Sequence, residues 1–286
     1  MPTYHEVLSS GRQKLAAFGE DASLEAQLLL TYVTGVSRSG LLASLSDPCP
    51  DDVERRFCEV IDRRLSRYPI QWILGEMEFM GRTYQVSEGV LIPRSDTEVV
   101  VETACELLDR YDCVIECGFG SGIISIPLAL HRPDFLIDAW DIDPSAVALA
   151  LCNANRHGVT TVRWHLGDFF ESSLFIRRLA KTHRVLLVSN PPYIPTADIA
   201  ELDETVKGFE PHLALDGGSD GLRFYRQLMG LVSSFSNSFG VVLEVGIGQA
   251  ESVATLMADL PEMNVRFVQD LSGINRVVVG EFTITR

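Results

Sequence analysis

The sequence predicts an α/β protein in which a small helical domain precedes a larger domain built on a mainly parallel sheet. From about residue 96 onward, apolar runs with the length of buried strands alternate with helical stretches, which is typical of a parallel sheet covered on both faces. A glycine-rich loop follows the first of these runs, and residues 1–67 contain no strand pattern. We therefore expect an N-terminal helical domain (residues 1–75), a β-hairpin linker (76–95) and a sheet domain (96–286).

The N-terminal domain is expected to begin with short helices. Asp21 and Ser23 can cap a helix over residues 24–34 that stops at Gly35, and residues 41–45 suggest a further short helix. No secretory signal is predicted, because charged side chains interrupt the first twenty residues. The longest uncharged stretch is also shorter than a membrane-spanning helix requires, so we expect a cytoplasmic protein with no membrane contact.

A longer helix is predicted from Pro50 through Arg67. Acids occupy its first turn and arginines its end, as the helix dipole favours. The arginines could form a partner-binding face or an ordinary solvated surface, and both interpretations stay open. They are Arg55, Arg56, Arg63, Arg64 and Arg67.

The sheet domain and the linker carry the strand signals. Alternating apolar and polar residues around Gly81 predict a hairpin over residues 76–92. Seven further strands are expected near residues 112–117, 136–141, 161–166, 185–190, 240–245, 265–269 and 275–282. The stretch 194–221 is rich in proline, glycine and charge, and it is predicted to hold a short helix over residues 197–206. A connection this long is usually functional or disordered.

A glycine loop and an acid together suggest a nucleoside-bearing cofactor. The strand at residues 111–117 leads into Gly118-Phe119-Gly120-Ser121-Gly122, whose alternate glycines let the backbone approach a ligand closely. The spacing differs from the G-x-G-x-x-G that holds a pyrophosphate. Asp141 ends the next strand, nineteen residues past Gly122, where a doubly wound sheet places an acid against ribose hydroxyls. S-adenosylmethionine is the commonest cofactor of this kind without a pyrophosphate.

Asp168 and Phe169 are the candidate adenine-binding residues. An acid followed by an aromatic residue at the carboxyl end of a strand can hydrogen-bond to a purine and pack against its ring. The alternative for Phe169 is ordinary core packing, and Asp168 could simply form a turn.

The sequence Asn190-Pro191-Pro192-Tyr193 follows the apolar run 185–189 and is the most informative motif of the chain. Two prolines fix the backbone and remove two donors, so nearby carbonyl oxygens are held in place outside the sheet ladder. Together with the Asn190 amide and the Tyr193 ring, these acceptors suit a planar –NH2 group, on an amide or on a nucleobase. A strand end stopped by two prolines is the plain alternative.

Charge and composition bear on the partner. The net charge is −15, of which −3 comes from residues 1–95 and −12 from the rest of the chain. A protein that neutralises nucleic-acid phosphates needs the opposite sign, so a protein substrate is favoured and a nucleic-acid substrate is not expected. The six cysteines form no C-x-x-C pair and the six histidines no H-E-x-x-H spacing, so neither a disulfide framework nor a metal site is predicted.

Taken together, these motifs resemble the HemK/PrmC-type release-factor glutamine methyltransferases over most of the chain. The resemblance implies a Rossmann-like, seven-stranded class I methyltransferase domain whose last two strands form an antiparallel pair. Three positions depart from the usual family pattern: Glu116 replaces Asp, Phe119 replaces Thr and Ser95 replaces Pro. The supporting segments are residues 69–75, 91–98, 118–122, 141–143, 190–193, 210–221 and 244–246.

The resemblance also implies roles for the site. The cofactor would be S-adenosylmethionine, with its methionine part at the glycine loop, its ribose at Asp141 and its adenine at Phe169. The substrate would be the glutamine of the Gly-Gly-Gln loop in peptide-chain release factors, whose methylation modulates translation termination. The N-terminal helices would grip the same partner, and residues 194–221 would cover the glutamine. Candidate cofactor-binding residues are Glu116, Gly118, Phe119, Gly120, Ser121, Gly122, Asp141, Asp168, Phe169 and Asn190; candidate substrate-binding residues are Asn190, Pro191, Pro192 and Tyr193, of which Asn190, Pro191 and Tyr193 are the catalytic candidates.

Two other hypotheses remain at this stage. A methylase of the adenine amino group in nucleic acid would use the same Asn-Pro-Pro-Tyr turn, although the negative charge argues against it. A non-enzymatic cofactor-binding protein could retain the fold, although the intact glycine loop and turn disfavour that.

Overall fold

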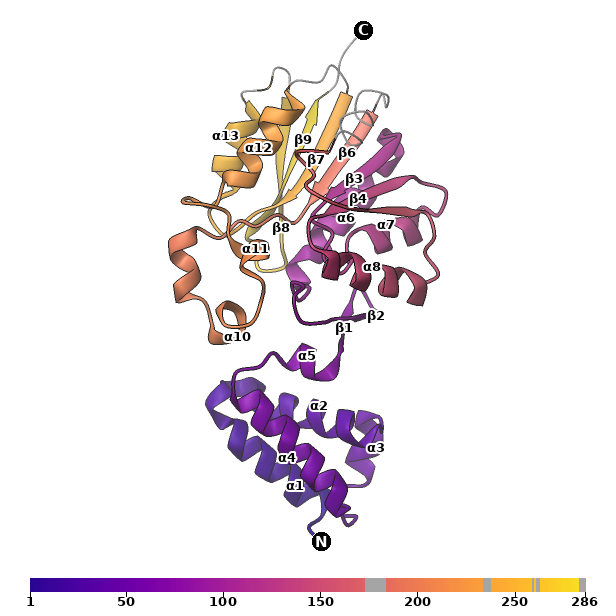
Figure 1. The fold of residues 1–286 in the computed structure, drawn as a ribbon, viewed down its shortest axis with the longest axis vertical. Coiled ribbons are helices and arrows are strands. Elements are labelled where there is room, and N and C mark those ends of the chain that lie inside the picture. Colours follow the sequence, from indigo (N-terminus) through magenta and orange to yellow (C-terminus); the bar gives the residue numbers. More distant parts are fainter. Residues whose placement is uncertain (173–183, 234–237, 259, 261–262, 283–286) are drawn as a thin grey trace. The chain divides into compact units, whose positions relative to one another are not determined.

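The computed structural model describes residues 1–172, 184–233, 238–258, 260 and 263–282. The chain divides into two compact units (Figure 1). Unit 1 comprises Met1–Glu76 together with Glu204–Phe209, and unit 2 comprises Met77–Asp203 and Glu210–Arg286. A short segment from the middle of the chain therefore belongs to the N-terminal unit. In the described part of the chain, no helix combines the length and the apolar character needed to cross a bilayer.

Unit 1 is a helical bundle around one apolar core. Its core residues recur on the inner faces of the helices, among them Leu8, Leu29, Leu30, Phe57 and Ile61. Phe209 of the inserted segment packs edge-on against Tyr68, with ring centroids 5.5 Å apart. The helices are α1 (Tyr4–Lys14), the 3₁₀ helix η1 (Leu15–Asp21), α2 (Ala22–Thr34), α3 (Arg38–Ala43), α4 (Asp51–Leu65), α5 (Ile70–Leu74) and α10 (Glu204–Lys207).

The expected start of the second helix was wrong. Asp21 makes no capping hydrogen bond with its side chain, because η1 runs directly into α2 and the backbone is already helical at this point. The expected end is confirmed, since Gly35 adopts the left-handed conformation that closes a helix. The predicted long helix ends at Leu65 instead of Arg67, whose φ of 68° is incompatible with a helix.

The five arginines of the predicted basic face do not share one environment. Arg64 is buried and donates two hydrogen bonds to the carboxylate of Glu25, at 2.8 and 2.9 Å. Its guanidinium also lies 4.0 Å from the ring centroid of Phe18. Arg64 therefore belongs to the interior of unit 1 and cannot form part of a partner-binding face. Arg55 and Arg56 are exposed on the same helix.

Unit 2 is built on the seven-stranded sheet that the sequence predicts. The strand order is β5-β4-β3-β6-β7-β9-β8, and the first five strands run parallel to one another. β9 pairs antiparallel with both β7 and β8, which confirms the terminal antiparallel pair. The strands are β3 (Cys113–Cys117), β4 (Ile137–Asp141), β5 (Val162–Leu166), β6 (Arg184–Ser189), β7 (Ser238–Glu244), β8 (Met263–Gln269) and β9 (Asn275–Phe282).

Helices cover both faces of this sheet (Figure 1). Because side chains alternate along a strand, Val114 of β3 packs in the cluster formed with α6, α7 and α8, whereas Ile115 packs in the cluster formed with α12 and α13. The two cores lie on opposite faces and make a three-layer α/β structure. The helices are η2 (Ser95–Thr97), α6 (Glu98–Leu107), η3 (Leu108–Arg110), α7 (Ser125–His131), α8 (Pro144–Arg156), η4 (Thr196–Glu201), α11 (His212–Leu215), α12 (Arg223–Val232) and α13 (Ala250–Ala258).

The predicted hairpin is present as β1 (Glu76–Phe79) and β2 (Arg82–Gln85). Met80 and Gly81 form its turn, and both have positive φ, as a tight two-residue hairpin turn requires. The helix predicted over residues 197–206 is instead two short helices, η4 and α10. They are separated because Leu202 is extended, with ψ of 159°.

Candidate active site at the carboxyl ends of the parallel strands

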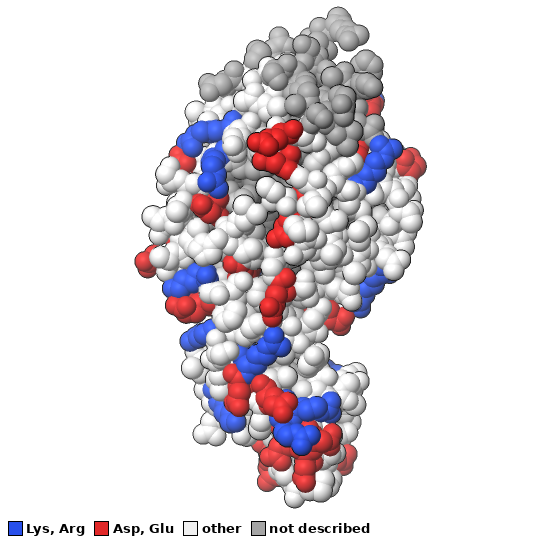
Figure 2. All heavy atoms as spheres, viewed as in Figure 1, with Lys and Arg blue, Asp and Glu red and all other residues white. Residues whose placement is uncertain are grey.

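The sheet order places a binding cleft between two particular strands. From β3 the chain proceeds to β4 and β5 on one side of the sheet, and it then returns to β6 and β7 on the other. Ligands of open α/β sheets bind where this order reverses, outside the carboxyl ends of the strands. A cavity of about 340 Å³ lies there, lined by Cys117 at the end of β3, by Gly118 directly after it and by Asn190 after β6. Figure 2 shows a hollow in this face of unit 2.

The glycine loop forms one wall of the cavity. Gly118 has φ of 73° and Gly120 has φ of 52°, a region of backbone conformation that other residues rarely adopt. A Cβ at Gly118 would have no atom within 4 Å. Since Gly118 lines the cavity, its bare Cα leaves room for a ligand to approach the backbone.

Asp141 joins this loop to the end of β4. Its Oδ2 accepts a hydrogen bond from the Gly120 N–H at 2.9 Å, and its Oδ1 accepts one from the Asp143 N–H at 3.0 Å. Burial raises the pKa of the Asp141 carboxyl, while these backbone hydrogen bonds act in the opposite direction. A carboxylate has about four lone-pair sites, so Asp141 retains acceptor capacity for a ligand hydroxyl.

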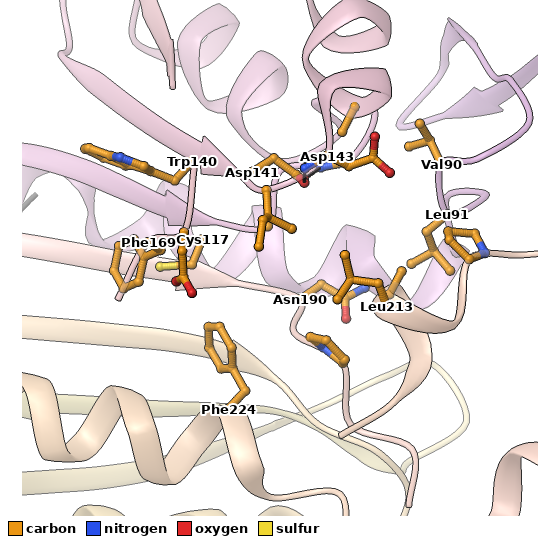
Figure 3. A pocket seen from close by; sticks show the side chains of 18 of the residues that line it. Val90, Leu91, Cys117, Trp140, Asp141, Asp143, Phe169, Asn190, Leu213 and Phe224 are labelled. Atoms are coloured by element: carbon orange, nitrogen blue, oxygen red, sulfur yellow. Dashed lines mark hydrogen bonds between the residues drawn. The ribbon is translucent and has the colours of Figure 1, made fainter. Parts of the chain in front are cut away.

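Aromatic side chains gather at one end of the cavity, as Figure 3 shows for Trp140, Phe169 and Phe224. Phe169 packs edge-on against Trp140, with centroids 6.0 Å apart, and Phe170 packs against Phe224 at 5.3 Å. Trp140 is fixed from behind by stacking on His165 at 4.3 Å. This end offers a flat apolar surface suited to a heteroaromatic ring.

Asn190 lies between the aromatic end and an aliphatic end formed by Val90, Leu91 and Leu213 (Figure 3). Pro192 also lines the cavity. The amide nitrogen of Asn190 donates a hydrogen bond to the Thr97 hydroxyl at 3.1 Å.

Several predicted site residues lie outside the lining. Phe119 is buried against Trp164, with ring centroids 4.9 Å apart. Ser121 is buried as well, and its hydroxyl has no hydrogen-bond partner. Gly122 packs under the loop, where an added Cβ would come within 2.9 Å of Ile126. Pro191 is also buried and is not among the lining residues.

Tyr193 is likewise outside the lining and faces Glu244. Its hydroxyl donates to Glu244 Oε1 at 3.4 Å, and its backbone carbonyl accepts a 2.8 Å hydrogen bond from Gln249. Burial, followed by the charge of Glu244, raises the pKa of the Tyr193 hydroxyl. These contacts make the base of the Asn-Pro-Pro-Tyr turn rigid.

Glu116 is fully buried on β3, directly before the lining residue Cys117. Its Oε2 accepts a hydrogen bond from the Ser125 hydroxyl, and its Oε1 has no partner. Burial raises the pKa of Glu116 to about 8. Strand alternation explains the position, because Cys117 turns toward the cavity and Glu116 therefore turns toward α7.

The lining carries excess negative charge. It includes four acids, Asp141, Asp143, Asp168 and Asp216, and one arginine, Arg223. Such a site favours a cationic ligand over a phosphate-bearing one. Among the residues that the structure describes, no group of three or more metal-ligating side chains could hold a metal ion.

Sequence reasoning missed part of the lining. Val90 and Leu91 precede the sheet domain and Arg223 follows a long connection, so no local pattern links them to the glycine loop. Leu213 lies within residues 194–221, the stretch that is expected to cover the substrate. The place of Trp140 in the lining could have been predicted, because this residue directly precedes Asp141 at the end of a predicted strand.

Comparison with known proteins identifies the family. The description "PrmC N-terminal domain" matches residues 6–75, and "Methyltransferase small domain" matches residues 96–217. A release factor glutamine methyltransferase of Geobacter sulfurreducens is 40% identical over 280 residues, covering 97% of this chain and 96% of the relative. The chain belongs to the release factor glutamine methyltransferase family.

Two further similar proteins carry release-factor methyltransferase names. The release factor glutamine methyltransferase of Bacillus subtilis is 36% identical and is covered over 97% of each chain. A crystal structure of a release-factor-specific protein-(glutamine-N5) methyltransferase from Alicyclobacillus acidocaldarius is 32% identical, with a TM-score of 0.39, over 69% of this chain and 98% of that one. The resemblance inferred from the motifs is confirmed, as is the class I methyltransferase fold. The match supports S-adenosylmethionine as the cofactor.

Proposed function

We propose that this enzyme transfers the methyl group of S-adenosylmethionine to the side-chain amide nitrogen of a glutamine in the Gly-Gly-Gln motif of peptide-chain release factors. The observation that carries the proposal is that the stiff Asn190–Pro192 turn opens onto the same cavity as the glycine loop and Asp141. A methyl acceptor and a methyl donor bound at these two places would share one cavity. The names of the relatives supply the release factor as the protein substrate.

The cavity fits the cofactor in shape and charge. S-adenosylmethionine has a purine at one end, a ribose in the middle and a cationic sulfonium and amine toward the other end. We assign the purine to the aromatic surface of Phe169 with Asp168 beside it, the ribose to Asp141, and the methionine part to Gly118 and Gly120. The four acids of the lining favour this cation. When bound, the cofactor supplies an electrophilic methyl group on sulfur.

Glu116, Phe119, Ser121 and Gly122 support the loop from behind instead of touching the cofactor. They are buried or packed under the loop and are absent from the lining. Tyr193 supports the turn in the same way through Glu244 and Gln249.

The chain's own residues orient the substrate amide. An amide nitrogen is a weak nucleophile because its lone pair is delocalised into the carbonyl. Of the two acceptors suggested by the sequence, Asn190 lines the cavity and Pro191 does not. If the Asn190 Oδ1 accepts an N–H of the substrate amide, it restrains the nitrogen so that its lone pair is directed toward the methyl group. Positioning of this kind can contribute up to ~7–11 kcal/mol, and acceptors that bind the nitrogen more tightly as it gains positive charge add to it. No residue is assigned as an obligatory base.

The adenine methylase alternative is not favoured. An acceptor base would bring its phosphates to a cavity whose lining contains four acids and one arginine. The family match also points to a protein acceptor.

Mass spectrometry of a purified release factor, incubated with the enzyme and labelled S-adenosylmethionine, tests the proposal. We expect one added methyl group on the glutamine of its Gly-Gly-Gln motif. Asn190→Ala should abolish the transfer while cofactor binding is partly retained, and a release factor with that glutamine changed to alanine should stay unlabelled. Labelling of RNA or DNA in place of the protein would overturn the assignment.

A further inference from the structure

A buried chain of hydrogen bonds leads from Glu244 to the proposed substrate-orienting side chain. The Thr97 hydroxyl donates to Glu244 Oε2 at 2.7 Å, and the Asn190 amide nitrogen donates to the Thr97 oxygen at 3.1 Å. Thr97 and Glu244 are both fully buried. The three residues come from η2, β7 and the turn after β6, far apart in the sequence.

Glu244 is held firmly at the start of this chain. Its backbone carbonyl accepts a 2.7 Å hydrogen bond from the Tyr225 hydroxyl, and its Oε1 accepts one from Tyr193. The nearby Arg276 is paired with Asp96 and Asp270, each at 3.1 Å. Glu244 therefore presents Oε2 to Thr97 from a fixed position.

The direction of each bond follows from the atoms involved. Burial raises the pKa of Glu244 to about 7. Above that pH its ionised carboxylate can only accept, so the single proton of the Thr97 hydroxyl is committed to Glu244. Toward Asn190, the Thr97 oxygen can then act only as a hydrogen-bond acceptor. The side of the Asn190 carboxamide that faces Thr97 must therefore be its –NH2, and its oxygen must face the other way.

This orientation matters because the two ends of a carboxamide have opposite hydrogen-bonding character. Rotated by half a turn, Asn190 would present –NH2 to the –NH2 of a substrate glutamine, and two donors cannot pair. Thr97 is available for this task because its side chain makes no capping hydrogen bond to α6, although it occupies the N-cap position of that helix.

We infer that Thr97, oriented by Glu244, is a positioning residue that fixes which end of the Asn190 carboxamide meets the substrate amide. The inference rests on the proposed function, since it concerns the acceptor that a glutamine would use. Thr97 lies behind Asn190 and does not line the cavity, so it acts through Asn190 and not by contact with either ligand.

The test uses three variants of the full chain. Thr97→Val keeps the shape of the side chain and removes the hydroxyl, and Thr97→Ser keeps the hydroxyl. Thr103→Val is the matched control, because Thr103 is also a buried threonine, in α6, and is absent from the cavity lining. The first measurement is nuclear magnetic resonance of the Asn190 side-chain amide protons, assigned by comparison with Asn190→Asp. Slow exchange of one proton should be lost in Thr97→Val and kept in Thr97→Ser.

The second measurement is methyl transfer to the release factor, with cofactor affinity measured separately. Thr97→Val should lower kcat on the order of tenfold or more, because a buried donor loses its partner and the carboxamide can rotate. Cofactor affinity should stay close to that of the wild type. Thr97→Ser should recover most of kcat, and Thr103→Val should leave it close to the wild-type value.

The outcomes separate this inference from the proposed function. If the wild-type enzyme methylates the release factor and Thr97→Val does so equally well, the positioning role is overturned and the proposed function stands. Equal losses in Thr97→Val and Thr103→Val would also overturn it, by showing a general packing effect. A wild-type enzyme that leaves the release factor unmethylated overturns the proposed function itself.

Discussion

The carboxylate of Asp141 holds the glycine loop through a 2.9 Å hydrogen bond from the backbone N–H of Gly120. The same carboxylate lines the cavity and accepts a second bond from the Asp143 N–H. One side chain thus fixes the shape of the loop and forms part of the proposed cofactor site. Changes at Asp141 should therefore affect binding through two routes at once.

Asp141→Asn should weaken S-adenosylmethionine binding on the order of tenfold or more, because hydrogen bonds to a charged group contribute about 1.5–3 kcal/mol. The new –NH2 would oppose one of two backbone N–H donors, and a negative charge would be lost. Isothermal titration calorimetry measures the effect. Asp143→Asn is the control: it also removes a lining acid, yet asparagine can replace Asp143 as the cap of α8. Equal losses in both variants would contradict a role in holding the loop.

Two glycine substitutions should separate binding from folding. Gly118→Ala should lower the free energy of unfolding by about 1–2 kcal/mol, the usual cost of a left-handed side-chain-bearing residue, and should impair cofactor binding because its methyl enters the cavity. Gly122→Ala carries the same strain, and its Cβ would also lie 2.9 Å from Ile126 Cδ1 and 3.1 Å from Trp164. It should be the less stable variant by about a further 1–3 kcal/mol. Chemical denaturation gives the ranking, and the reverse order would refute this account.

The buried Glu116 should make stability depend on pH. Burial raises the pKa of its carboxyl from the ordinary value of 4.5 to about 8. The folded state therefore binds more protons than the unfolded state between these values, so stability is full below about 4.5 and declines as the pH rises through about 8. Glu116→Gln removes the titrating carboxyl and with it this pH dependence. The free energy of unfolding of the variant relative to the wild type should thus increase with pH across that window, and parallel pH profiles would contradict the prediction.

Arg64→Met should destabilise unit 1 by about 3 kcal/mol, because it leaves the largely buried Glu25 carboxylate, whose side chain is 12% exposed, without its partner. The double variant with Glu25→Met should recover much of the loss, since apolar replacement of a whole buried pair is often neutral. Arg55→Met, on the exposed side of the same helix, should change stability by about 0.5 kcal/mol or less. Denaturant titration of the four proteins tests this. A single Arg64→Met variant as stable as Arg55→Met would show that the pair contributes little.

The sheet was predictable because its strands are short apolar runs separated by clear turn signals. Strands buried on both faces favour runs of apolar residues, and β3 has such a run over residues 113–115 and β6 over residues 185–188. The glycine loop, Asp141, Phe169 and Asn190 could be predicted to lie close together for a related reason. Each stands at or soon after the end of a parallel strand, and the carboxyl ends of these strands lie at one edge of the sheet.

Contacts between distant segments could not be predicted in this way. Thr97 and Asn190 are 93 positions apart, and Thr97 and Glu244 are 147 apart, so no spacing rule joins them. The sequence does contain a signal for the burial of Arg64. Val53, Phe57, Ile61 and Arg64 recur at helical spacing, which places the arginine on the apolar stripe of α4. The start of α2 was missed because η1 precedes it without a break.

Residues 204–209 belong to unit 1, although the chain on either side of them belongs to unit 2. The polypeptide therefore passes between the units three times, after positions 76, 203 and 209. Cutting the chain once at the first passage would not release an intact N-terminal module, because Phe209 would stay behind with its partner ring Tyr68 removed. Gene fusions or swaps that treat the first 75 residues as an interchangeable cassette should carry this hexapeptide with them.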